Sequence, residues 1–443
     1  MSAEDTSPNS EDDIAEKFVR PGRGRYLTNH AAAFITLVAN ILIYRLCAQG
    51  LGDQAFNEYA VGKRTLSYGL TFMTTGIGYT MSHHVASCSA GEEEGDGAYL
   101  LTGTALMLAS MAPLFLLVAL FPQQVAFLFF GNGARQELAL PLAVALLGSS
   151  ALNVCNSFLF GKMEFTKSAW VIVVGGGFLP LAVVLLVETS AAAIFLWQGI
   201  GAVVVAVISY LLFLRPLVAQ RVSSRSVWRS AAGKFLAYGL PRVPGAFAVT
   251  ALLALPVTLA THQTEDLAVA GVLSLGGTIL TLVGVAVDPF SRVLLPQSSA
   301  LVAAGRGHEL RKPILRFSAG MILVLTPFLL VVGLFIKPLI AAFLNPELAS
   351  HAGIILWLLP ACLPYAFFRC FRGIVDGAFK SALNTRFSLL SLAAFGFWAL
   401  LAYGLGWPQP ALQGHLVGQL VLGGLTFWKV WELANQVDEL DSR

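Results

Sequence analysis

The chain has 443 residues, of which 56% are hydrophobic and only 12% are charged. Ordinary soluble domains carry about 25% charged residues, so this composition excludes that class and indicates a membrane protein. The net charge of +3 is small. No basic stripe with interleaved aromatic residues occurs, and this argues against nucleic acid as a partner.

Apolar runs long enough to cross a bilayer recur along the whole chain. About 20 apolar residues span the hydrocarbon core as a helix, and a helix satisfies its own backbone polar groups there. We therefore expect an all-α, polytopic fold with about twelve transmembrane helices. In chain order the runs cover 27–50, 62–86, 98–121, 138–160, 168–187, 191–214, 236–260, 267–292, 317–336, 351–371, 387–405 and 411–431.

Lysine and arginine alternate between the connections that join these runs. The basic connections include the one before the first run and the one around residues 215–234, whereas the intervening connections are short and poor in positive charge. By the positive-inside rule, the basic connections and both termini are cytoplasmic. Lys63, Arg64, Arg135 and Lys337 are exceptions that this topology places on the outer side.

The basic stretch near the middle divides the chain into two halves of six runs each. Because six is even, the halves enter the membrane from the same side and form parallel repeats. A gap-free alignment of Tyr26 with Phe235 also places Gly62 on Gly271 and so supports a repeat. The expected units are a disordered cytoplasmic tail (1–25), an N-terminal six-helix bundle (26–214), a cytoplasmic linker (215–235), a C-terminal six-helix bundle (236–431) and a cytoplasmic tail (432–443).

Arginines within or at the edge of the apolar runs are the main candidates for a substrate site. A charge in hydrocarbon costs about 2.5–3.5 kcal/mol on insertion scales, so such residues face a wet cavity or a partner. The planar guanidinium can also bind phosphate through two parallel hydrogen bonds. The alternative is that they reach the interface or pair with backbone carbonyls. The candidates are Arg45, Arg242, Arg292, Arg369 and Arg372.

Three further titratable residues are candidates for coupling or gating. Asp288 is a carboxylate well inside a predicted span, and an intramembrane acid is a default functional site; the simpler interpretation is an ion pair with Arg292 one turn away. His83 and His84 end the second span on the inner side, where they could titrate near neutral pH or pack at the interface.

The sequence carries no nucleophile constellation, no Walker loop and no metal-binding motif. Its five cysteines include no CxxC pair, so neither a metal site nor a disulfide framework is indicated. We therefore expect no cofactor, no metal and no enzymatic activity, and transport driven by an ion gradient, a substrate gradient or both.

Three motifs resemble one transporter family. YGLPRVPG at Tyr238–Gly245, LLPQSSALVAAGR at Leu294–Arg306 and FRGIVDG at Phe371–Gly377 are similar to the polysaccharide-exporter branch of the multidrug/oligosaccharidyl-lipid/polysaccharide (MOP) superfamily, which contains the O-antigen-type flippases. The topology resembles this branch over nearly the whole chain.

The resemblance implies two six-helix bundles that form a V, as in the MATE transporters, around a central cavity in the inner (cytoplasmic) membrane. It also implies transfer of an undecaprenyl-pyrophosphate-linked oligosaccharide from the cytoplasmic to the outer leaflet. A polysaccharide polymerase and glycosyltransferases are candidate partners, beside membrane lipids. Arg242, Arg292 and Arg372 lie in the matching motifs and are implied to hold the pyrophosphate.

Two other function classes compete with a flippase. A cation-coupled multidrug antiporter of the MATE type usually binds cationic cargo through a carboxylate, yet the first span has no acid and carries Arg45. A membrane-embedded sugar polymerase or ligase typically needs a large outer loop, and the longest outer connections, 122–137 and 337–350, are short. A scaffold without transport would leave the intramembrane arginines unexplained.

Overall fold

The computed structural model describes residues 23–89, 96–187, 190–218, 225–263, 267–303, 307–344, 346–379 and 381–435. Within these ranges the secondary structure is helical and contains no strand. The predicted all-α fold is therefore confirmed. The predicted tail 1–25 lies almost entirely outside the described residues, and so does most of the tail 432–443.

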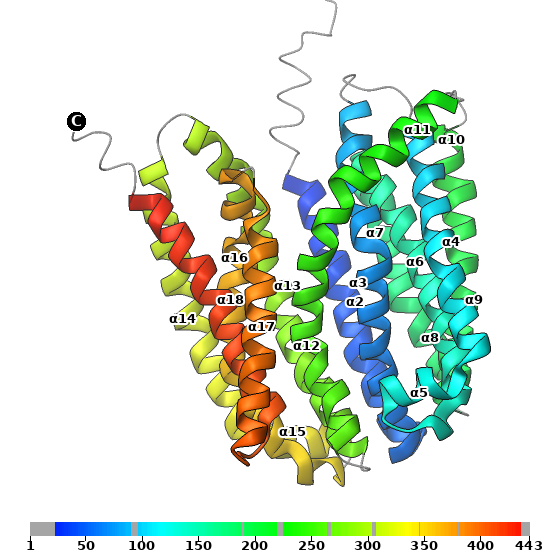
Figure 1. The fold of residues 1–443 in the computed structure, drawn as a ribbon, viewed down its shortest axis with the longest axis vertical. Helices are drawn as coiled ribbons and strands as arrows, with labels where there is room; N and C mark the ends of the chain where they lie inside the picture. The colour runs from blue at the N-terminus through cyan, green and yellow to red at the C-terminus, as the bar shows by residue number, and fades with distance from the viewer. Residues whose placement is uncertain are drawn as a thin grey trace, which may run out of the picture.

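The first half of the chain crosses the molecule in long helices joined by short connections (Figure 1). The connection between α4 and α6 contains two short helices, α5 (Pro122–Phe130) and η1 (Gly133–Leu138). The long elements are α2 (Arg23–Gly50), α3 (Asp53–Ser89), α4 (Asp96–Leu120), α6 (Ala139–Gly161), the run of α7 (Phe165–Val173), η2 (Val174–Phe178) and α8 (Leu179–Leu186), and α9 (Ala191–Ser209) with η3 (Tyr210–Leu214).

The second half repeats this plan after the short helices α10 (Arg215–Val218) and α11 (Arg225–Lys234). The helix η6 (Gly307–Leu310) precedes α14, and α15 (Ile336–Phe343) follows it. The long elements are η4 (Phe235–Gly239), η5 (Leu240–Arg242) and α12 (Val243–Gln263), then α13 (Leu267–Ala303), α14 (Arg311–Leu334), the run of η7 (Leu348–Trp357), η8 (Leu359–Ala361) and α16 (Cys362–Ala378), α17 (Leu383–Gly404) and α18 (Pro410–Asn435).

Ten of these segments are long and apolar enough to cross a membrane, as judged by length and composition in the described residues. The expected spans 62–86 and 411–431 correspond to α3 and α18, which are also long but more polar. The start predicted for α3 was wrong, because the helix begins at Asp53 and includes most of the expected outer connection. Lys63 therefore lies roughly 15 Å into the helix rather than at its edge.

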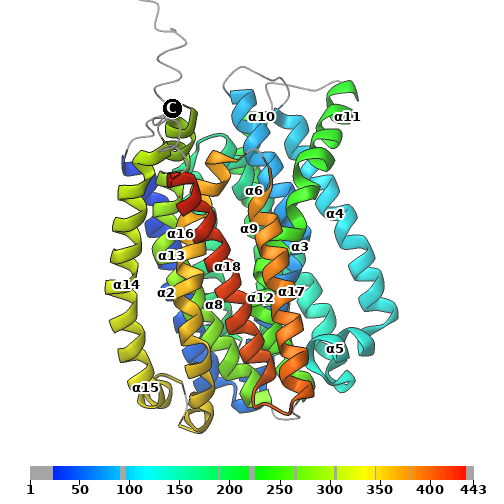
Figure 2. The same cartoon turned by 60° about the vertical axis from the view of Figure 1, so that its left-hand side comes forward.

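The two halves form neighbouring groups of helices (Figures 1 and 2). We call α2–α9 the N-bundle and α12–α18 the C-bundle. The start of α2, the end of α18 and α11 lie at one end of the molecule, the terminal end, whereas α5 and α15 lie at the other, the opposite end. Both ends of the described chain are therefore on the same side, as an even number of crossings requires.

Small residues allow the helices to approach closely, as is common where lipid supplies no hydrophobic driving force between them. A Cβ added to Gly199 of α9 would lie 2.5 Å from the carbonyl carbon of Val144 in α6. In the C-bundle, a Cβ on Gly377 of α16 would lie 2.5 Å from the carbonyl oxygen of Leu295 in α13. These contacts bring the backbones of neighbouring helices together within each bundle.

The α6–α9 contact provides a test of this packing. We expect Gly199→Ala to lower the melting temperature in detergent, because overpacking costs about 1–3 kcal/mol and exceeds the gain in helix propensity of about 1 kcal/mol. The matched control is Gly320→Ala in α14, where an added Cβ meets nothing within 4 Å. The control should melt at or above the wild-type temperature; equal melting of both variants would contradict the packing argument.

Candidate functional site

Arg242 is placed by a break in the helical hydrogen-bond ladder just before α12. Pro241 and Pro244 have no backbone N–H and cannot continue an α-helix undisturbed, and the chain passes through a π turn and a 3-10 turn there. The Arg242 Nη1 donates to the Tyr238 carbonyl at 2.7 Å, and its Cζ lies 3.7 Å from the centre of the Tyr238 ring. The half-buried guanidinium is thus fixed in orientation, while four of its five N–H donors remain for other acceptors.

Arg369 and Arg372 are three residues apart and share one face of α16. The guanidinium of Arg369 forms an ion pair with Asp288 on α13 and lies 5.9 Å from the centre of the Tyr365 ring. The described partner of Asp288 is therefore an arginine on another helix. The expected intrahelical pair with Arg292 involves a side chain outside the described residues. The ion pair of Asp288 with Arg369 is electrically neutral and connects α13 to α16.

Arg372 reaches from the C-bundle to the N-bundle. Its Nη2 donates to the Tyr79 hydroxyl of α3 at 3.1 Å. Asp376, one turn further along α16, lies close enough to both Arg372 and Arg242 to feel their charge. Its Oδ1 accepts a hydrogen bond from the Asn384 Nδ2 at 2.7 Å. We call this group the arginine cluster; its members are Arg242, Arg369, Arg372, Tyr79 and Asp376.

Positive charge exceeds negative charge in the arginine cluster. In the described ranges, Asp288 compensates Arg369, whereas neither Arg242 nor Arg372 forms an ion pair with a carboxylate. Their partners are a carbonyl, an aromatic face and a phenol. Such an arrangement suits a multivalent anion, because charge-assisted bonds from two guanidinium groups would replace weak neutral contacts.

The two remaining arginine candidates, Arg292 and Arg45, are not among the members of the arginine cluster. Arg292 belongs to α13, one turn beyond Asp288, but its side chain lies outside the described residues. Arg45 is exposed near the end of α2, and its Cζ lies 5.5 Å from the centre of the Phe343 ring of α15. The structure thus places Arg45 at the opposite end, where it contacts the C-bundle, and not in the arginine cluster.

The neighbouring histidines contact each other edge to face at 5.0 Å between ring centres and differ in exposure. His83 is exposed and stacks on Tyr238 at 4.6 Å between ring centres, beside the cation–aromatic contact of Arg242. His84 is buried in the N-bundle and stacks on Tyr99 at 5.3 Å. His84 also contacts the edge of Tyr238 at 5.7 Å, so both histidines adjoin the arginine cluster through this ring. No group of three or more metal-ligating residues occurs in the part of the chain that the structure describes.

Arg64 is a buried cation that the sequence analysis missed as a site residue. It is 9% exposed and extends from α3 into the C-bundle, where its Nη2 donates to the Thr278 hydroxyl at 2.8 Å and its Nε donates to the Ser274 hydroxyl at 3.3 Å. Gly277 provides the space, because a Cβ there would lie 2.9 Å from Nη2. Arg64 is therefore a cross-bundle contact.

Lys63, the adjacent residue, points into the N-bundle instead. Its ammonium donates to the Asn40 side chain and, at 3.4 Å, to the Tyr59 hydroxyl. It also lies 5.5 Å from the centre of the Tyr44 ring. The described partners of Lys63 are thus neutral, which is costly for a lysine inside a membrane segment.

Further contacts join the bundles at the opposite end. The Tyr44 and Ser274 hydroxyls are 3.1 Å apart, and the His262 Nε2 lies 2.9 Å from the Leu128 carbonyl oxygen. Gly131 has a φ of +69° and approaches α12 so closely that a side chain would meet the backbone. The opposite end is therefore closed in this conformation.

A pair of carboxyl groups also crosses the bundles at this end. Asp53 begins α3, and Glu347 lies in the connection after α15. The hydrogen bond with Asp53, reinforced by the charge of Asp53, raises the pKa of Glu347 above its ordinary value. A raised pKa means that the protonated carboxyl favours this contact, so the contact weakens as the pH rises through that pKa.

Comparisons with known proteins identify the fold. No protein-family model matches the sequence, and no curated protein matches it. Among solved structures, an inward-facing multidrug resistance MATE family transporter of the MOP superfamily matches with a TM-score of 0.72 at 16% identity, over 91% of this chain and 96% of that chain.

Two other MOP structures match over similar lengths. An outward-facing MATE family transporter gives a TM-score of 0.66 at 16% identity, over 96% of this chain and 98% of that one. A MOP superfamily transporter from Pyrococcus furiosus gives 0.61 at 14% identity, over 95% and 98%. The chain therefore has the multi-pass MATE fold, as predicted.

Removal of Arg64 should loosen the opposite end. We expect Arg64→Met to increase the population in which the bundles are separated there, because hydrogen bonds to a charged group contribute about 1.5–3 kcal/mol and each 1.4 kcal/mol changes a population ratio about tenfold. This separation can be measured by double electron–electron resonance between spin labels on cysteines introduced at Ala134 and Ser350 in a cysteine-free background. Lys429→Met, which removes an ion pair within α18, is the matched control and should leave the distances unchanged.

The Asp288–Arg369 pair gives a second test. We expect Asp288→Asn to lower the free energy of unfolding by up to about 3 kcal/mol, because it leaves a half-buried guanidinium without a counter-charge. The measurement is the melting temperature, which should fall. The double variant Asp288→Asn/Arg369→Met should recover most of the loss, since no unpaired charge remains. A double variant as unstable as Asp288→Asn would show that the pair is not the source of the effect.

Proposed function

We propose that the protein is a flippase that moves a polyprenyl-pyrophosphate-linked oligosaccharide from the cytoplasmic to the outer leaflet by alternating access. The observation that carries this proposal is the presence of two guanidinium groups without a paired carboxylate, Arg242 and Arg372, next to elements of both bundles. A pyrophosphate offers several acceptor oxygens and more than one negative charge, which match this pair.

The conformation supports an alternating-access cycle. The described cross-bundle contacts of Arg64, Tyr44 and His262 lie toward the opposite end. The terminal end is cytoplasmic by the charge rule of the sequence analysis. In this state the arginine cluster would accept a headgroup from the cytoplasmic leaflet, and separation of the opposite-end contacts would release it outward.

The rival function is a cation-coupled multidrug antiporter, because the comparison structures include MATE transporters. An organic cation needs a free carboxylate in the cavity, whereas Asp288 is paired with Arg369 and Asp376 lies near two arginines. The Pyrococcus furiosus structure is described as having a binding pocket of reversed polarity that suggests a different function. Pockets of different polarity are therefore compatible with this fold, and the arginine cluster favours an anionic cargo here.

Transport of a lipid-linked anion can be measured directly. We expect proteoliposomes with the wild-type protein to flip a fluorescent polyprenyl-pyrophosphate oligosaccharide, and Arg242→Gln and Arg372→Gln each to lose about 10- to 100-fold in rate. The expected loss corresponds to about 1.5–3 kcal/mol for each hydrogen bond to a charged group. Arg316→Gln, an exposed arginine of α14, is the matched control and should flip at the wild-type rate.

The same vesicles separate the two functions. Proton- or sodium-driven efflux of cationic dyes, without flipping of the lipid-linked oligosaccharide, would replace the flippase with the antiporter. Flipping that survives both arginine substitutions would retain the flippase and move its anion site elsewhere.

A further inference from the structure

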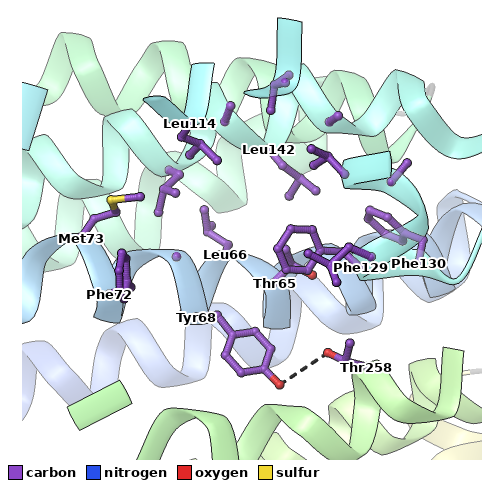
Figure 3. A pocket seen from close by; sticks show the side chains of 18 of the residues that line it. Thr65, Leu66, Tyr68, Phe72, Met73, Leu114, Phe129, Phe130, Leu142 and Thr258 are labelled. Atoms are coloured by element: carbon purple, nitrogen blue, oxygen red, sulfur yellow. Dashed lines mark hydrogen bonds between the residues drawn. The ribbon is translucent and has the colours of Figure 1, made fainter. Parts of the chain in front are cut away.

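A cavity of about 380 Å³ lies beside α3, apart from the arginine cluster. Its walls come from α3, α4, α5 and α6 of the N-bundle and from α12 of the C-bundle, as Figure 3 shows from close by. This volume falls in the range of about 300–1,000 Å³ that is typical of ligand pockets. Residues from these walls include Leu66, Leu114, Phe129, Leu146 and Phe247.

The walls of this cavity are almost entirely hydrocarbon. The hydroxyl groups among its lining residues already have partners: Thr65 donates to the Val61 carbonyl at 3.2 Å, and the Tyr68 and Thr258 hydroxyls are 3.4 Å apart. A water molecule needs two to four polar partners to remain in a cavity. The cavity therefore suits a hydrocarbon chain, which can reach the cavity from the surrounding bilayer.

The cavity opens toward the surface of the molecule. Phe72 is 57% exposed and Leu128 is 58% exposed, and both lie on its wall. The buried side of the wall includes Val118 and Ala143. A flexible chain can thus enter past the exposed side chains and end against the buried ones.

The cavity and the arginine cluster lie along the same pair of neighbouring elements. On α3, Phe72 precedes Tyr79 by seven residues, roughly 10 Å along the helix. On the other element, Phe247 follows Arg242 by five residues, roughly 8 Å. Phe72 and Phe247 contact each other edge to face at 6.0 Å between ring centres. The cavity is therefore one to two helical turns from the guanidinium groups, on the side toward the opposite end.

Charge distinguishes the occupants that could fill this cavity. Lysine and arginine are absent from its described lining, so a bulk phospholipid with its phosphate at the opening would find no cation there. A prenyl chain whose pyrophosphate is bound at Arg242 and Arg372 has its charge compensated a short distance away. The prenyl chain must also stay out of the water around the arginine cluster, because apolar surface is driven from water.

We propose that this cavity binds the polyprenyl chain of the cargo while its pyrophosphate lies at the arginine cluster. This inference rests on the proposed flippase function and extends it, because it assigns the lipid part of the cargo to a second site.

Photo-crosslinking in proteoliposomes tests the assignment with the wild-type protein. The probe is a polyprenyl-pyrophosphate oligosaccharide with a diazirine on the prenyl chain, and mass spectrometry maps the labelled peptides. We expect labels on cavity residues such as Leu66, Leu146 and Phe247, with at least a tenfold loss when unlabelled polyprenyl pyrophosphate competes. A diazirine phospholipid that labels the same residues and is not displaced by polyprenyl pyrophosphate would overturn the inference.

A cavity-filling variant gives a second readout. We expect Ala143→Trp to reduce cavity labelling and flipping of the long-chain cargo at least tenfold, and to leave binding of a soluble pyrophosphate with a two-isoprene chain unchanged. Leu323→Trp, on the 75% exposed position of α14, is the control. If Ala143→Trp does not fold, the wild-type labelling map still decides the question.

The outcomes separate this inference from the function on which it rests. Flipping by the wild-type protein with prenyl-chain labels only outside the cavity would overturn the chain site and leave the flippase. Absence of flipping, in vesicles where another flippase works, would overturn the proposed function and the chain site together.

Discussion

The high cost of a charge inside a membrane is the constraint on which this structure depends. A cation there costs about 2.5–3.5 kcal/mol on insertion scales, so each one needs a partner or a ligand. Arg64 donates hydrogen bonds across the bundles to Ser274 and Thr278. Arg369 forms an ion pair with Asp288 between two helices of one bundle. In the described residues, the hydrogen bonds of Arg242 and Arg372 go to a carbonyl and a phenol, and the two arginines share one nearby carboxylate, Asp376. This incomplete compensation is what supports Arg242 and Arg372 as the proposed anion site.

Close backbone packing determines where these charges can lie. The α13–α16 contact depends on Gly377 and Gly373, and the Gly373 N–H also donates to the Ser291 hydroxyl at 2.9 Å. This approach brings Asp288 against Arg369, so the glycines of the FRGIVDG motif act on the site through helix spacing. In the same way, Gly277 leaves the space that the Arg64 guanidinium occupies. Small residues and buried cations are therefore parts of one arrangement.

The sequence predicts the helical architecture better than it predicts which side chains pair with one another. Apolar length alone locates most of the spans, because the bilayer imposes it. The start of α3 was misplaced because Asp53, Asn57 and Glu58 make its first turns polar, although Asn57 and Glu58 are buried. Sequence spacing suggested Arg292 as a partner of Asp288, but it could not suggest the ion pair with Arg369, eighty-one positions away. Such long-range pairs depend on helix packing, which one sequence does not reveal.

The separation of two kinds of cross-bundle contact suits a transport cycle. At the opposite end, Arg64 and Tyr44 form several hydrogen bonds to the C-bundle, so opening there must break these contacts. Nearer the terminal end, the described contact of Arg372 with Tyr79 is a single hydrogen bond, which an anion could replace with stronger charge-assisted bonds. A cargo that draws Arg242 and Arg372 toward itself would stabilise approach of the bundles at its own end. That approach would act against the opposite-end contacts, and the free energy of anion binding would be used to open the outer side.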